Sequence, residues 1–290
     1  MFSQAVESIP VQRKLVRVFL FMLLALAFVQ PLASACPQKE TPRAIISEDF
    51  TKNRPKSPRK RPRNSRKRVR TYRLADTALL GSLAEYSLQA GVTVWRMEYV
   101  PVSRSPWIAR RVESNTEFRA GEFLRLSIES PHPGYLYVVN RDWFTDGSSG
   151  ETNLIFPLLG EDNRVQAGKL IDIPAANINP FKTDPKPNQA GEMLTVIITS
   201  EPLRLPLSDK PLPVSNTELD EWKQRWGGPT ARYEMNGAAG EVRTKNERQA
   251  AKRRGTRQLT RDDPGPQTIY LLAPRNADGL LFNLMLSYAP

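Results

Sequence analysis

The sequence is poor in the two side chains that build most metal centres and many nucleophilic sites. Among 290 residues there is one cysteine, Cys36, and one histidine, His132. A single cysteine cannot form an intrachain disulfide or a cysteine-based structural metal site. A single histidine removes most histidine-dependent triads and most zinc and iron sites. These shortages predict a protein that is not an enzyme and that needs no cofactor.

Acidic residues are missing from one stretch, Lys52 to Arg73, which holds twelve lysines and arginines. This charge equals the net charge of the whole chain, +12, so residues 74–290 are close to neutral. Repulsion between like charges, together with recurring prolines, predicts a disordered basic linker over residues 36–73. The candidate polyanion-binding residues are Arg59, Lys60, Arg61, Arg63, Arg66, Lys67, Arg68 and Arg70.

The basic run has two readings, a solvated spacer or an electrostatic attachment to a polyanion. Tyr72 is the only aromatic residue within the run, so a platform for base stacking is lacking and nucleic acid is an unlikely partner. An anionic component of the cell envelope, such as phospholipid head groups or an acidic polymer, fits the charge better. A protein partner for the neutral part remains open.

The first 35 residues have the three parts of a secretory signal peptide. A basic start, Arg13–Arg17, precedes an apolar run, Val18–Val29, and the small residues Ala33–Ala35 follow. The apolar run is short for a transmembrane helix, although an uncleaved anchor is the alternative. We therefore expect an exported protein of the periplasm or cell envelope, with no transmembrane helix after cleavage.

Cys36 adds a second possibility for the mature N-terminus. The sequence "LASAC" resembles the lipobox of bacterial lipoproteins, in which the cysteine is lipidated. Ala33 replaces the usual leucine three positions before that cysteine, and the same residues also suit ordinary cleavage. Lipid anchoring through Cys36 and plain secretion both remain open.

From Val92 onward the sequence pattern predicts short strands separated by turns, with few helical patterns between them. In "FLRLSIE" apolar and polar residues alternate, which predicts a half-buried strand with a solvent-facing side, whereas "GYLYVVN" is apolar on both faces. These features predict an all-β fold, an antiparallel β-sandwich of immunoglobulin-like or jelly-roll-like type. Further strands are expected at Val92–Val100, Thr152–Phe156, Leu170–Ile173, Met193–Thr199, Thr268–Leu272 and Leu280–Tyr288.

One or two short helices interrupt the strands late in the chain. "SNTELDEWKQRWGG" has a Ser215 cap, an apolar stripe and a glycine stop. "TKNERQAAKRRG" repeats the capping pattern with Thr244 and Glu247 but has little apolar surface, so we expect a solvated basic helix. Asp76–Gln89 is a further helix candidate.

The order of several motifs resembles a known bacterial family. "FRAGEFLRLSIESPHPGYLYVVNRD" is followed by "LIFPLLGEDNRVQAGKLIDIP" and then by "GEMLTVIITSEPL". Together they are similar to a domain of unknown function of the 4384 type, marked by a Gly-Tyr-Leu-Tyr strand, across about Val92–Leu203. The resemblance implies a β-sandwich accessory module, found alone after signal peptides or attached to kinase-like and caspase-like proteins. It supplies no catalytic residues.

This interpretation divides the chain into a signal peptide (1–35), a linker (36–73) and a β-sandwich domain (74–290). The family-like core of the domain is 92–203, and its C-terminal extension is 204–290. The expected function is a non-catalytic, extracytoplasmic binding or accessory module at or near the cell envelope. The alternatives are a carboxylate-dependent envelope glycan hydrolase and polyanion or nucleic-acid binding through the linker.

Few residues in the domain are candidates for chemistry. The loop "DWFTDGSSGE" offers oxygen ligands for calcium from Asp142, Asp146 and Glu151, although its spacing is not that of an EF-hand. His132 lies between two prolines and lacks an evident partner for general-base catalysis. A hydrolase would draw its carboxylates from Asp142, Asp146, Asp262 and Asp263. Trp222 and Trp226 are expected in the core before any sugar-stacking role.

Overall fold

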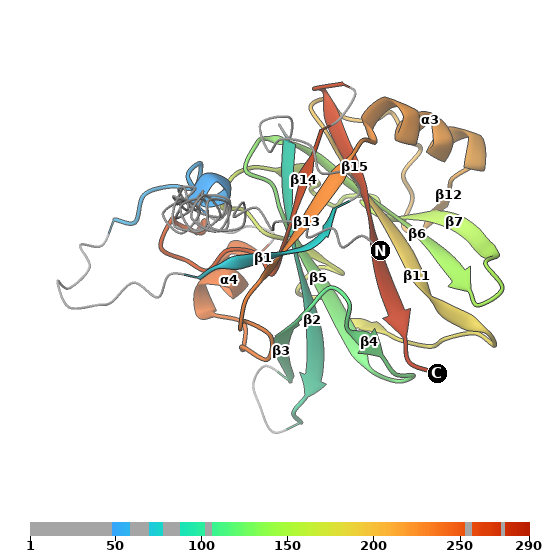
Figure 1. Ribbon diagram of the computed structural model, residues 1–290, viewed down its shortest axis with the longest axis horizontal. Helices are drawn as coiled ribbons and strands as arrows, with labels where there is room; N and C mark the ends of the chain where they lie inside the picture. The colour runs from blue at the N-terminus through green and yellow to red at the C-terminus, as the bar shows by residue number, and fades with distance from the viewer. Residues whose placement is uncertain (1–47, 59–69, 78–87, 102–105, 253–256, 274–275) are drawn as a thin grey trace, which may run out of the picture. The chain divides into compact units, whose positions relative to one another are not determined.

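The computed structural model describes residues 48–58, 70–77, 88–101, 106–252, 257–273 and 276–290. The expected signal peptide, Cys36 and the basic residues from Arg59 to Arg68 lie outside these ranges. The described residues form two β-sheets that pack face to face, with short helices outside them (Figure 1). The all-β sandwich expected from the sequence is confirmed. Of the described helices, none has the length and apolar character needed to cross a membrane.

Sheet 1 has eight strands among the described residues. Its main path runs β1-β13-β14-β2-β5-β10, and all its pairs are antiparallel. The long strand β2 pairs with β5 on one edge, and with β14 and then β3 on the other. The strands are β1 Tyr72–Thr77, β2 Leu88–Tyr99, β3 Trp107–Val112, β5 Phe123–Glu129, β9 Ile171–Ile173, β10 Phe181–Lys182, β13 Thr230–Met235 and β14 Thr268–Leu272.

Sheet 2 has seven strands among the described residues, in the main order β12-β7-β6-β11-β15-β4. Its long strand β11 lies between β6 and β15, and the short strand β4 adds the one parallel pair recorded here. The strands are β4 Glu117–Phe118, β6 Gly134–Phe144, β7 Ser149–Phe156, β8 Arg164–Val165, β11 Gln189–Thr199, β12 Leu212–Pro213 and β15 Gly279–Tyr288.

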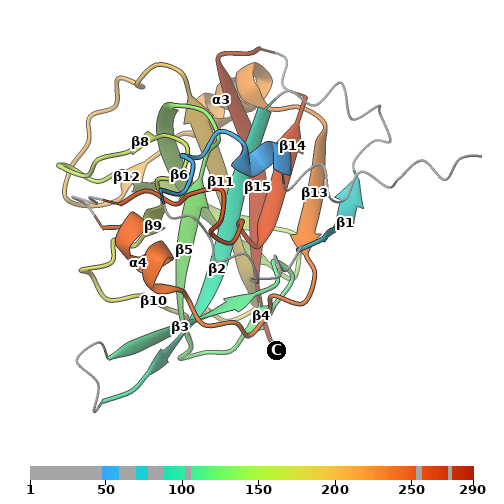
Figure 2. The same cartoon turned by 90° about the vertical axis from the view of Figure 1, so that its left-hand side faces the viewer.

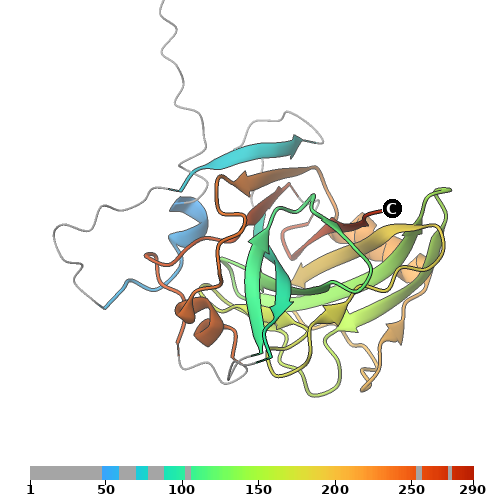
Figure 3. The ribbon, with the colours of Figure 1, turned by 90° about the horizontal axis from the view of Figure 1, so that it is seen from below.

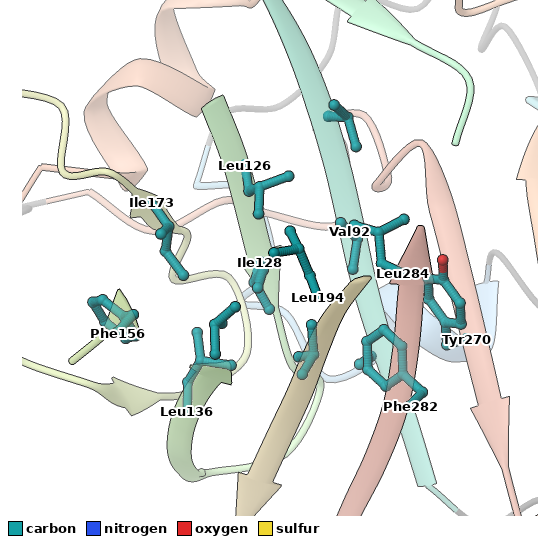
Figure 4. Packing of buried hydrophobic residues seen from close by; sticks show 14 of the residues in the cluster. Val92, Leu126, Ile128, Leu136, Phe156, Ile173, Leu194, Tyr270, Phe282 and Leu284 are labelled. Carbon is teal, nitrogen blue, oxygen red and sulfur yellow. The ribbon is translucent and has the colours of Figure 1, made fainter. Parts of the chain in front are cut away.

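The main core lies between the two sheets and follows from the alternation of side chains along each strand (Figure 4). Leu126 and Ile128 of β5 meet Leu136 of β6, Leu194 of β11 and Leu284 of β15 in one cluster. The strands expected at Thr268–Leu272 and Leu280–Tyr288 are present, and even-numbered residues from Leu280 to Tyr288 face this core.

The other face of sheet 2 is covered by helix α3, Asn216–Trp226 (Figure 1). The Ser215 hydroxyl caps the helix by accepting a hydrogen bond from the Glu218 N–H at 3.1 Å. Trp222 and Trp226 pack on Tyr137 of β6 in a second cluster. This packing explains why both faces of "GYLYVVN" are apolar, and it gives the two tryptophans a core role.

The other face of sheet 1 is also covered, on the side opposite α3 (Figures 2 and 3). Helix α4, Lys245–Ala250, and one helical turn at residues 48–51 lie on this side. The expected capping box of α4 is confirmed, because Thr244 and Glu247 bond each other's backbone N–H. The expectation of a solvated helix is wrong in part, since Glu247 and Ala250 are buried.

Two further expectations need correction. "FLRLSIE" has no solvent-facing side, because Arg125, Ser127 and Glu129 are buried beneath the covering segments. The candidate helix Asp76–Gln89 is wrong at both ends, which belong to β1 and β2, and residues 78–87 lie outside the described part.

The linker expected over residues 36–73 is also shorter than predicted. Residues 48–58 and 70–73 belong to the folded body, since Phe50, Arg54 and Tyr72 are buried. Arg70, counted among the polyanion-binding candidates, forms an ion pair with Glu241 at 2.7 Å. The physical reason is that a few anchoring side chains can order a segment whose overall composition is that of a linker.

Candidate functional site

A cavity of about 410 Å³ opens at one end of sheet 1, where β7, β9 and the end of α4 approach one another. Its volume lies within the roughly 300–1,000 Å³ typical of small-molecule sites. Apolar side chains form much of the wall, and two lysines, Lys169 and Lys252, add positive charge. The lining residues are Phe156, Glu161, Asp162, Lys169, Leu170, Ile171, Asp172, Ala175, Ala176, Asn177, Ala251 and Lys252.

Each carboxylate in the cavity already accepts hydrogen bonds from the protein. Asp162 accepts from Arg164 and from the Lys169 ammonium at 3.1 Å, and Glu161 accepts from the Leu158 N–H at 2.9 Å. Burial tends to raise the pKa of Asp162, but these hydrogen bonds outweigh it and lower that pKa. Asp162 is therefore held as a charged structural group.

Asp172 connects the cavity to a buried ionic network on the outer face of sheet 1. Arg243 donates to both Asp172 oxygens, Nη1 to Oδ2 at 2.8 Å and Nη2 to Oδ1 at 2.7 Å. The Ser127 hydroxyl also donates to Asp172 Oδ1 at 2.6 Å, and Trp95 Nε1 donates to Ser127 at 2.8 Å. A bidentate pair of this kind fixes both side chains in one geometry.

Two more buried ion pairs extend this network. Arg111 pairs with Glu247 of α4, and its guanidinium lies 5.1 Å from the centre of the Trp95 ring. Arg54 pairs with Glu129 of β5, and both side chains are 1% exposed. Breaking a buried pair by removing one partner typically destabilises by roughly 3–5 kcal/mol, so these pairs fasten the covering segments to sheet 1.

Arg54, Arg111 and Arg243 each pair with a carboxylate, whereas no ion pair to a described residue is found for Arg125. It donates to the Ile178 carbonyl, but its Nε has no partner in the structure. Burial lowers its pKa, Asp172 raises it, and the nearby Arg243 lowers it further. Its position beside the loop that forms one wall of the cavity adds positive potential there.

Away from the cavity, sheet 1 buries a carboxylate that only neutral donors satisfy. Glu234 of β13 accepts from the Ser114 N–H and hydroxyl, Thr268 and Gln267, at 2.9–3.2 Å. Burial raises the pKa of Glu234, against the opposing effect of these hydrogen bonds. Four hydrogen bonds in fixed positions indicate a structural group.

Two carboxylates lie side by side on strands β6 and β11 of sheet 2. Asp142 of β6 and Glu192 of β11 are direct cross-strand partners. Lys186 forms an ion pair with Asp142, and the Tyr288 hydroxyl donates to Glu192. Burial raises the pKa of Glu192 and, with the charge of Glu192, also raises that of Tyr288.

The calcium candidates do not converge. Asp142 binds Lys186 and Gln189, Asp146 accepts from the Ser148 N–H at its own turn, and Glu151 is exposed. Within the described ranges, no group of three or more acidic, histidine or cysteine side chains could hold a metal ion.

The other sequence candidates have structural positions. His132 lies in the turn between β5 and β6, where its backbone bonds Ser130. Asp263 accepts from Thr260 and Asn246 in a turn, and its neighbour Asp262 is exposed. Neither aspartate lines the cavity.

The comparisons with known proteins give one match. Residues 117–202 fit the family model described as a domain of unknown function, DUF4384. These residues are the DUF4384 segment of the chain. The DUF4384 segment supplies ten of the twelve residues that line the cavity, and the end of α4 supplies Ala251 and Lys252. No curated protein and no solved structure matches the chain.

Sequence reasoning missed the cavity and the ionic network. Its clearest signal was Asp172 in "LIDIP", a charged residue inside a short apolar strand. Such a residue predicts a buried partner, because an unpaired charge is costly to bury. The partner, Arg243, lies 71 positions further along the chain, and nothing in the local pattern marks it.

Proposed function

We propose that the chain is a non-catalytic binding module of the cell envelope and that its ligand occupies the cavity beside α4. The ligand has an apolar body and an anionic group. The observation that carries this proposal is the combination of an apolar wall with lysines, in a cavity whose carboxylates already accept bonds from the protein. Location at the envelope rests on the sequence of residues 1–35, and attachment through lipid on Cys36 belongs to the same proposal.

The two lysines have different roles in this proposal. Lys169 is held by Asp162 and by the Arg164 carbonyl at 2.6 Å, so it is already oriented. Lys252 is exposed, and its ammonium makes no recorded bond to the described residues. An exposed ammonium at the rim suits an anionic head group, while Ala175, Ala176 and Ala251 leave room for the apolar part.

Calorimetric titration of the full chain with dodecanoate, with dodecanol as the uncharged counterpart, tests the proposal. We expect saturable binding of dodecanoate and about tenfold weaker binding to Lys252→Ala, since a hydrogen bond to a charged group contributes roughly 1.5–3 kcal/mol. Ala176→Trp should abolish binding by filling the cavity, and Lys182→Ala, an exposed lysine outside it, should not matter. Equal binding by wild type and Ala176→Trp would rule out the cavity.

A second candidate, a carboxylate-dependent glycan hydrolase, is favoured by Asp142 and Glu192. Cross-strand partners have Cβ atoms about 5 Å apart, and retaining glycosidases hold their two carboxylates at about 5–5.5 Å. The raised pKa of Glu192 suits a general acid. Asp142, which pairs with Lys186, would be the second carboxylate. Incubation with purified envelope glycan should then release reducing ends, and Glu192→Gln should stop it while Asp146→Asn does not. Absence of release by the wild type excludes this candidate.

A further inference from the structure

The covering segment at residues 48–58, here called the strap, is held by two side chains four positions apart. The first is Phe50, which is fully buried in a cluster with Tyr72, Tyr233, Met235 and Ile269. The site is shaped to the ring, because a Cβ added at Gly91 of β2 would lie 2.7 Å from Phe50 Cζ. Only glycine at that position leaves space for the aromatic ring.

The second anchor is Arg54, which is 1% exposed. Its Nε and Nη2 donate to Glu129 Oε1 and Oε2 at 2.7 and 2.6 Å. Its Nη1 lies within bonding distance of three backbone carbonyls, those of Thr260, Asp263 and Pro264, at 3.1–3.4 Å. Every nitrogen of the guanidinium group therefore points at an acceptor of the body.

Between and beyond these anchors the strap is attached lightly. Lys52 and Asn53 are exposed, and the strap forms no strand with either sheet. The recorded backbone bonds to the body are those from Arg261, whose N–H and Nε donate to the carbonyls of Pro55 and Arg54 at 3.1 Å. A buried aromatic and a buried arginine among exposed and half-buried positions are typical of a peptide ligand bound to its receptor.

The surface beneath the strap has a definite chemistry of its own. It presents a carboxylate, Glu129, beside carbonyl oxygens, all of which are acceptors, so it selects a group with several donors. Next to it lies a pocket walled by Gly91, Pro266 and apolar side chains, which selects a flat ring. We propose that this outer face of sheet 1 is a peptide-binding site for a phenylalanine followed four residues later by an arginine. Its resident ligand is the strap of the same chain.

To test the site, the chain is cut after the strap, so that the strap is no longer covalently joined to the body but can stay bound to it. A recognition sequence for a specific protease is inserted between Asn64 and Ser65 of the full chain, and the purified protein is cleaved there. We expect the N-terminal piece to co-elute with the body in size-exclusion chromatography. A fluorescent peptide of residues 48–58, added in excess, should then exchange into the site and show a rise in polarisation.

Variants of the peptide, rather than of the body, keep the test independent of folding. Peptides with Arg54→Ala or Phe50→Ala should compete at least tenfold more weakly than the natural peptide. Lys52→Ala is the matched control, an exposed basic residue two positions from Arg54, and should compete within twofold of the natural peptide.

Three outcomes would overturn the proposal. One is equal competition by the natural, Arg54→Ala and Phe50→Ala peptides. Another is loss of the N-terminal piece from the wild-type body immediately on cleavage, with no uptake of the fluorescent peptide. A third is a dimer before cleavage that exchanges tagged and untagged copies, which would assign the strap to a second copy rather than to its own chain.

Discussion

Arg54 and Glu129 lie 75 positions apart in the chain and meet through two parallel hydrogen bonds of 2.6–2.7 Å, with both side chains 1% exposed. Glu129 Oε1 also accepts from the Gly168 N–H at 3.1 Å. Burial alone would lower the pKa of Arg54, but the Glu129 carboxylate raises it, so the guanidinium group stays charged. This contact joins the N-terminal strap, strand β5 and the turn before β9.

Removing either partner of this pair leaves a buried charge without compensation. We expect Arg54→Ala and Glu129→Gln each to lower the free energy of unfolding by about 3–5 kcal/mol, measured by urea denaturation. The double variant Arg54→Ala/Glu129→Gln should recover part of the loss, because it leaves neither buried charge without its partner. Lys52→Ala, at an exposed pair with Asp49, is the control and should change stability by less than about 1 kcal/mol. Additive losses in the double variant would contradict a direct coupling.

Glu234 should make stability depend on pH. Its pKa in the folded protein is raised from the usual 4.5, so its contribution to folding is fullest below that value and is lost as the pH rises through the folded pKa. Glu234→Gln removes the buried charge, and its amide can still bond Ser114 and Thr268. We expect the variant to be about 1 kcal/mol more stable at pH 7. Thermal unfolding between about pH 4.5 and 8 should show a flatter profile than the wild type.

Exposed Glu221→Gln provides the comparison for that experiment. It should leave the pH profile of the melting temperature unchanged. A Glu234→Gln profile as steep as that of the wild type would mean that another group controls it.

The DUF4384 segment should not fold by itself. Residues 117–202 contain β4 to β11, but β11 pairs with β15 over nine residue pairs and β5 pairs with β2, and both partners lie outside. Expressed alone, the segment would expose two long strand edges and half of the inter-sheet core. Near-ultraviolet circular dichroism should show no fixed aromatic packing. A cooperative thermal transition from residues 117–202 would prove this wrong.

The basic run can be tested without disturbing the body. Replacing Arg59, Lys60, Arg61, Arg63, Arg66, Lys67 and Arg68 with serine spares the buried Arg54 and the paired Arg70. We expect the melting temperature to stay the same and retention on anionic vesicles to fall, by roughly 1 kcal/mol for each charge near the surface. Cosedimentation at low and high salt measures this, and zwitterionic vesicles are the control. Unchanged retention would assign membrane binding to another part of the chain.

Alternation of side chains was enough to predict the strands of the core. "FLRLSIE" is β5 in full, and Thr268–Leu272 is β14 in full. The same alternation misled on exposure, because Arg125, Ser127 and Glu129 look solvent-facing in sequence. Arg54 and Arg243, which lie far from β5 along the chain, contact Glu129 and Ser127, and Arg125 bonds the Ile178 carbonyl. A local pattern of alternating residues predicts a strand, but it does not predict which distant segment covers each face of that strand.

The strap shows a second limit of the same kind. Its composition is basic and proline-rich, which is typical of disorder, and two side chains overcome that tendency. Phe50 is the only aromatic residue between Cys36 and Arg70, and it follows the acidic pair Glu48 and Asp49, a usual beginning for a helix. That signal was present. The role of Arg54 was not predictable, because its acceptors come from β5 and from residues 260–264.

Strand β15 has a consequence for the order of events during synthesis. It ends at Tyr288, yet it lies between β11 and β4 in sheet 2 and supplies a row of the main core. A ribosome that adds roughly 5–20 residues each second completes every other strand of that sheet before β15 emerges. Until β15 emerges, the nascent chain lacks the strand that lies between β11 and β4, and the edge of β11 stays open to chaperones.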